Sequence, residues 1–172
     1  DAVFERRTLV RGDEGAVKFL ENSAEINSPN TENIMDTKKF GFAVIAYVVV
    51  TFVIAAGWHL VLFKDLYDHL GIFSRKEPII PLGIASMVMQ ALVLAYLYPR
   101  FYRGGNPVAT GALFGLLVGV LMASIAVFAE AGKHQVSSLP TWLIFESTYY
   151  LLQFGLVGVC IGSIYGRSIP QR

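Results

Sequence analysis

Cysteine and charge are both scarce in this chain of 172 residues. Because Cys160 is the only cysteine, no disulfide can form within the chain, and cysteine usage says nothing about the redox compartment. Charged residues make up 16% of the sequence, against roughly 25% in soluble domains. The net charge is +1 and no lysine or arginine cluster is present, so nothing favours nucleic acid as a partner.

Catalytic signatures are missing as well. The sequence contains no CxxCH haem attachment, Walker loop, GxSxG elbow, HExxH pair or dinucleotide fingerprint. It also shows no nucleophile–base pair. An enzyme is therefore not predicted, and no cofactor is evident from motifs.

Long apolar runs are what the chain does have. Four of them, 40–63, 79–98, 108–129 and 142–165, are long enough to cross about 30 Å of hydrocarbon. They lack the alternation of barrel strands, and their short connections make neighbouring helices antiparallel. The predicted fold is all-α, an up-down-up-down four-helix transmembrane bundle over residues 35–172. Lipid is its first expected partner.

A polar extension, residues 1–34, precedes the predicted bundle. Residues 13–25 could form a short helix there, but its apolar face is too small to support a domain. The segment lacks the apolar centre of a signal peptide. Met35 directly before the first apolar run looks like a natural start, so whether the extension is native stays open.

Basic residues near the predicted spans suggest an orientation. An even number of spans puts both termini on one side, and that side carries the larger number of lysines and arginines. We therefore expect an inner membrane protein of bacteria with cytoplasmic N- and C-termini. The terminal side carries Lys38, Lys39, Arg100, Arg103, Arg167 and Arg172, and the opposite side Lys64, Arg75, Lys76 and Lys133.

Small residues recur at four-residue spacing in the last two apolar runs. This spacing places them in one stripe along a helix, where another backbone can approach closely, as in GxxxG contacts between membrane helices. The stripes predict helix packing, either against each other or against another helix or subunit. They consist of Gly111, Gly115, Gly119 and Ala123 in the third run and Gly158, Gly162 and Gly166 in the fourth.

Few polar side chains lie within the predicted spans. Thr51, Gln90 and Gln153 are expected near the midplane, where the amides need partners and could bond each other. His59 and Glu146 each lie about 6 Å below the far-side interface. A carboxylate at that depth must be paired, protonated or hydrated, so Glu146 is the leading functional candidate.

Three roles for this polar pair stay open. Glu146 could simply bond His59, could handle protons or substrate, or could bind a metal with His69 and His134 from the adjacent loops. His59 alone could also ligate haem or a pigment, since small residues flank it in an apolar helix.

The sequence further resembles uncharacterised bacterial four-helix membrane proteins grouped as domains of unknown function. The shared positions are Gly57-Trp58-His59, Tyr67, Leu70-Gly71, Pro78, Pro81, Gly111-Ala112-Leu113-Phe114-Gly115 and Pro140. The resemblance covers about residues 38–166. It implies a four-span bundle and carries over no activity or site residues.

These observations predict a non-catalytic accessory or assembly subunit, held in a larger membrane complex or in a self-association. The alternative is a small transporter or binder of an ion or small apolar molecule, which would use Glu146 and His59. A pigment- or haem-binding subunit is the third hypothesis.

Overall fold

A computed structural model describes residues 36–72, 75 and 77–166 of the chain. Every regular element among them is helical. The polar extension, Met35, Lys76, Arg167 and Arg172 lie outside the described residues. The elements are α2 (Thr37–Ala56), η2 (Gly57–Leu62), α3 (Lys64–Leu70), α4 (Ile80–Phe101), α5 (Pro107–Ala123), η3 (Ser124–Ala129) and α6 (Leu139–Gly166).

Four helices are long and apolar enough to cross a membrane, which makes this chain a small multi-pass membrane protein with an all-α fold. They are Thr37–Leu62, Ile80–Phe101, Pro107–Ala129 and Leu139–Gly166. Large apolar side chains such as Val61 (74% exposed) cover their outer surfaces. Such surfaces suit lipid, which solvates apolar side chains without cost.

Side chains and prolines fix where the helices begin. Asp36 accepts hydrogen bonds from the amides of Lys38 (3.1 Å) and Lys39 (3.2 Å) at the start of α2. Asn106 does the same for Val108 (3.0 Å) and Ala109 (3.1 Å) at α5, which has Pro107 in its first turn. Both arrangements satisfy amides that have no partner within the helix.

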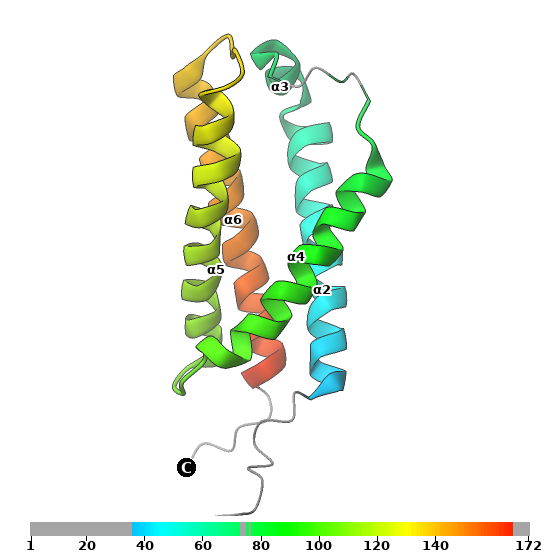
Figure 1. Ribbon diagram of the computed structural model, residues 1–172, viewed down its shortest axis with the longest axis vertical. Coiled ribbons are helices and arrows are strands. Elements are labelled where there is room, and N and C mark those ends of the chain that lie inside the picture. Colours follow the sequence, from blue (N-terminus) through cyan, green and yellow to red (C-terminus); the bar gives the residue numbers. More distant parts are fainter. Residues whose placement is uncertain (1–35, 73–74, 76, 167–172) are drawn as a thin grey trace, which may run out of the picture. The chain divides into compact units, whose positions relative to one another are not determined.

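The helices pack unevenly (Figure 1). α5 lies along α6 over most of its length, and α2 contacts both α4 and α6. α4 crosses the others obliquely and has few contacts with α5 and α6. The larger core cluster joins α2, α4 and α6 and includes Phe114 of α5. Tyr47, Tyr98 and Phe154 are its largest fully buried side chains.

Glycines bring the backbones of α5 and α6 together. A Cβ atom on Gly115 would lie 2.1 Å from the Phe154 carbonyl oxygen, and one on Gly158 would lie 2.1 Å from that of Gly111. Gly162 and Gly166 lie as closely against Pro107. Gly119 has more room, since its nearest neighbour would be the Tyr150 oxygen at 3.1 Å. Ala123 belongs instead to a second core cluster, described below.

The second span continues past its predicted end at residue 98. Pro99 and Arg100 lie inside α4, which ends at Phe101. Proline removes the hydrogen bond that the carbonyl four residues earlier would accept, so Ala95 loses its partner within the helix. The Tyr165 hydroxyl donates to that carbonyl at 2.9 Å. The helix therefore tolerates Pro99 because α6 supplies the missing donor.

Candidate functional site

The predicted polar pair lies where two helices change their winding. In η2 the Phe63 amide bonds the Trp58 carbonyl five residues earlier, at 3.0 Å, which is the wider π-type turn. η3 has the same winding in the chain segment that follows α5. Such turns are rare and occur often at functional sites. Here η2 carries Trp58 and His59 toward α6.

The short helix α3 covers this end of the bundle. Gly71 ends it in a left-handed conformation (φ +70°), which glycine adopts without strain. The Ser137 amide then donates to the Leu70 carbonyl at 3.0 Å, which ties α3 to the α5–α6 loop. Beneath it lies the second core cluster, which consists of Tyr67, Leu70, Ala123, Val127 and Trp142.

Glu146 is a buried carboxyl with defined partners. It is 4% exposed and accepts a short hydrogen bond from the Tyr67 hydroxyl. The indole N–H of Trp58 donates to the same hydroxyl at 2.9 Å. Burial, followed by the neighbouring Glu146 charge and hydrogen bond, raises the pKa of Tyr67 far above its ordinary value. Tyr67 therefore keeps its proton at neutral pH and remains a donor to Glu146.

His59 completes the cluster on its more open side. Its Nε2 lies 3.4 Å from Glu146 Oε2, and its Nδ1 lies 3.2 Å from the Ala55 carbonyl oxygen. The rings of Tyr149 and Tyr67 contact it, with centroid distances of 4.4 and 4.6 Å. His59 and Glu146, which the sequence predicts at the same depth below the interface, thus lie in contact.

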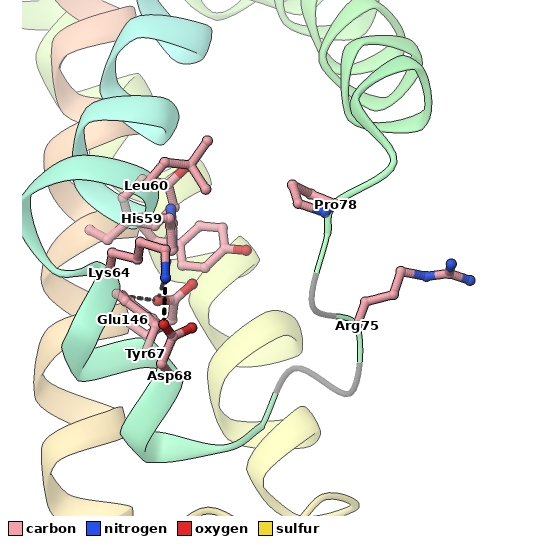
Figure 2. Close-up of a pocket in the computed structure, with 10 residues that line it drawn as sticks. His59, Leu60, Lys64, Tyr67, Asp68, Arg75, Pro78 and Glu146 are labelled. Carbon is pink, nitrogen blue, oxygen red and sulfur yellow. Dashed lines mark hydrogen bonds and ion pairs between the residues drawn. The ribbon is translucent and has the colours of Figure 1, made fainter.

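A cavity of about 800 Å³ opens beside this cluster. The residues that line it include His59, Glu146, Tyr149 and Tyr150, while Leu60 and Pro78 add apolar surface. Figure 2 shows Pro78 and Arg75, which precede α4, across the opening from His59 and Lys64. A second cavity of about 420 Å³ also reaches Glu146, from the side of η3 and the α5–α6 loop. Cavities therefore border the Glu146 side chain on two sides.

The charged groups at the cavity openings are mostly paired. Lys64 and Asp68 form an exposed ion pair at 2.6 Å, and the Asp68 carboxylate raises the pKa of Lys64. Glu130 pairs with Lys133 at 2.9 Å and His134 at 3.3 Å, and these partners lower its pKa. The charges within these pairs largely cancel, and Arg75, which lines both cavities, adds one positive charge.

The histidines proposed as metal ligands do not meet. Within residues 36–72, 75 and 77–166, no group of three or more histidine, cysteine, aspartate or glutamate side chains could hold a metal ion. His69 Nδ1 contacts the Asp65 carbonyl at 2.6 Å, whereas His134 pairs with Glu130. Both nitrogens of His59 are also engaged, so axial ligation of haem would require His59 to leave Glu146 or Ala55.

The midplane residues form a separate group. The Tyr47 hydroxyl donates to Gln90 Oε1 at 2.6 Å, and Gln90 Nε2 donates to Ser86 at 3.2 Å. The bonds of Gln90 thus go to α2 and its own helix rather than to Gln153. Thr51 and Gln153 are buried at 2% and 3% exposure.

Sequence reasoning did not assign Tyr67 or Trp58 to the site. Tyr67 lies in α3, between the first two spans, and Trp58 lies in η2. Trp142 is 2% exposed and donates to the Val127 carbonyl at 3.1 Å. The available signal was spacing, since Trp58 and Tyr67 flank the chain reversal after a span that ends near His59.

Comparisons with protein-family models, curated proteins and solved structures found no match to this chain. The resemblance to the bacterial four-helix proteins stays a prediction. The class of protein follows from the fold alone, and the site is interpreted from its own geometry.

Proposed function

We propose that this small multi-pass membrane protein binds a small molecule in the cavity beside Glu146. The observation that carries the proposal is a buried carboxyl on the wall of a cavity of about 800 Å³. Ligand pockets are commonly about 300–1,000 Å³ in size, with apolar walls and few polar groups. Ionisable groups inside membrane proteins commonly mark substrate paths.

The packing supports this function over a purely structural role for Glu146. Tyr67 already satisfies Oε2, and a bundle that needed only this bond would gain nothing from a neighbouring cavity.

Ligand-induced stabilisation of the purified full-length chain tests the proposal. A panel of amphiphilic compounds should contain some that raise the melting temperature of the wild type, since a ligand that binds only the folded state stabilises it. Leu60→Trp would narrow the cavity and should reduce or abolish these shifts. Val61→Trp is the matched control, because Val61 is 74% exposed and does not line the cavity. Equal shifts in both variants, or none in the wild type, would refute the proposal.

The accessory-subunit hypothesis is a second proposal and has different support. The glycine stripes of α5 and α6 contact each other within the chain, so only the exposed apolar surfaces now support a contact with other subunits. Gentle extraction followed by native mass measurement tests it. Stable co-purifying proteins would support a subunit role, and a lone chain with a bound small molecule would oppose it.

We further propose that both termini are cytoplasmic in a bacterial inner membrane. The support is the excess of basic residues on the terminal side, some of which lie outside the described residues. Reporter fusions after Arg172 and within residues 75–77 should report opposite compartments. A C-terminal reporter that is active only outside the cytoplasm would reverse the orientation.

A further inference from the structure

We infer that the cavity exchanges one proton for one organic cation at the Glu146 carboxylate. The inference rests on the proposed function and names the ligand class of the same site. It follows from the direction of each hydrogen bond around Glu146 and His59, from the paired charges nearby, and from the aromatic side chains that line the cavity.

The hydrogen bonds fix where the protons lie. The Trp58 indole can only donate, so Tyr67 accepts from it and points its own hydrogen at Glu146 Oε2. A carbonyl oxygen can only accept, so His59 Nδ1 carries a hydrogen toward Ala55. The tautomer thus follows from the hydrogen-bond network.

The contact between His59 Nε2 and Glu146 is a hydrogen bond only when one further proton lies between them. With Nδ1 protonated, Nε2 can bond Oε2 only if a proton lies on Nε2 or on Oε2. In the first case the pair is an imidazolium and a carboxylate, and in the second both groups are neutral. Either way the pair binds one exchangeable proton and has no net charge.

The zero net charge of the His59–Glu146 pair limits the charge of a ligand that can bind in the cavity. Adding an unpaired charge to a buried site is costly, so a cation that contacts Glu146 must displace the proton. His59 then becomes neutral with Nδ1 still bonded to Ala55, and the proton leaves to water. An anion would lie against a carboxylate without compensation.

Within residues 36–72, 75 and 77–166, the cationic side chains that line the two cavities besides His59 are exposed; they are Lys64, Arg75 and His134. Lys64 pairs with Asp68, Glu130 pairs with Lys133 and His134, and Figure 2 shows the Arg75 side chain directed away from Glu146. The other ionisable side chains of the described residues that line these cavities beside Glu146 are the phenols Tyr67, Tyr149 and Tyr150.

The geometry also makes the proton exchangeable and favours an organic cation. The Nε2–Oε2 distance of 3.4 Å is longer than the roughly 2.7–2.9 Å of tight charged bonds. The His59 side chain is 20% exposed and that of Glu146 5%, so His59 is the more accessible member of the pair. Tyr149 and Tyr150, whose aromatic rings can attract cations, are among the residues that line the cavity.

Tetraphenylphosphonium is a suitable probe, with tetraphenylborate as the anion of the same shape. Calorimetric titration of the full-length wild type should show that the phosphonium binds. Its dissociation constant should rise about tenfold for each unit of pH decrease while the pair is protonated. Each bound cation should release about one proton into weakly buffered solution. Tetraphenylborate should show neither effect.

Glu146→Gln should lose phosphonium binding, while Asp65→Asn, which removes an exposed carboxylate of α3 that lines neither cavity, should keep binding and its pH dependence. If Glu146→Gln does not fold, proton release by the wild type still tests whether the cation exchanges for a proton. Binding without pH dependence or proton release would overturn the exchange, as would no phosphonium binding. The proposed function would stand in those cases if Leu60→Trp still abolished stabilisation by other compounds.

Discussion

The two halves of α6 meet their neighbours in opposite ways. From Phe154 to Gly166, glycines bring the α6 backbone close to α5. From Trp142 to Tyr149, large aromatic and polar side chains face the neighbouring elements, and cavities border Glu146 on two sides. Side-chain size along one helix thus separates a closely packed contact from a binding site. The following changes test that comparison.

The largest effect is expected at the glycine contact. Gly115→Ala would place a Cβ 2.1 Å from the Phe154 carbonyl oxygen, so backbone atoms would have to move. The free energy of unfolding should fall by at least the roughly 1–3 kcal/mol typical of overpacked cores. Titration with a denaturing detergent, followed by circular dichroism, measures it.

Two glycines provide the controls for this change. Gly119→Ala should cost less, because its nearest neighbour would lie at 3.1 Å. Gly83→Ala in α4 meets no atom within 4 Å and should stabilise the helix by up to about 1 kcal/mol. Equal effects at all three positions would mean that α5 and α6 are not in close contact.

The second largest loss in the free energy of unfolding is expected when the polar group of Glu146 is removed. Glu146→Leu leaves Tyr67 and His59 without their shared acceptor and should cost about 1–3 kcal/mol. Glu146→Gln retains an oxygen for Tyr67 and should cost clearly less. The same detergent titration compares them, and a leucine variant as stable as the glutamine variant would contradict the proposed network.

Tyr67→Phe should have a smaller effect, about 1 kcal/mol, because one hydroxyl bond to Glu146 and one from Trp58 are lost. Its pH dependence is distinctive. The pKa of Tyr67 is raised in the folded state, so its contribution is complete below about pH 10, where the unfolded phenol ionises, and falls above it. The stability advantage of the wild type over Tyr67→Phe should therefore narrow at alkaline pH. A constant difference would contradict the assigned pKa shift.

The smallest effect is expected at the cavity opening. Asp68→Asn breaks an exposed pair with Lys64, whose side chains are 64% and 57% exposed. Exposed ion pairs contribute little because water and salt screen them. The melting temperature should not change measurably. A large loss would show that the pair supports α3 rather than only bordering the cavity.

Sequence alone predicts much of this molecule because bilayer thickness and helix rise are fixed quantities. They locate the four spans and put His59 and Glu146 at one depth. They do not reveal that Tyr165 satisfies the carbonyl freed by Pro99, because those residues are far apart in the chain. They also miss the π-type turn that reorients Trp58, and the bond from Tyr67 in a polar connection to Glu146. Such features depend on tertiary partners.

The placement of the aromatic residues also has an optical consequence. The chain contains two tryptophans, Trp58 and Trp142, and both lie at the α3 end beside the cavities. Indole emission from this protein therefore originates at one end of the bundle, and the Pro107–Gly166 end contributes none. A spectral change records events around Glu146, while loosening of the glycine contact near Gly162 leaves the emission unchanged until the whole bundle unfolds.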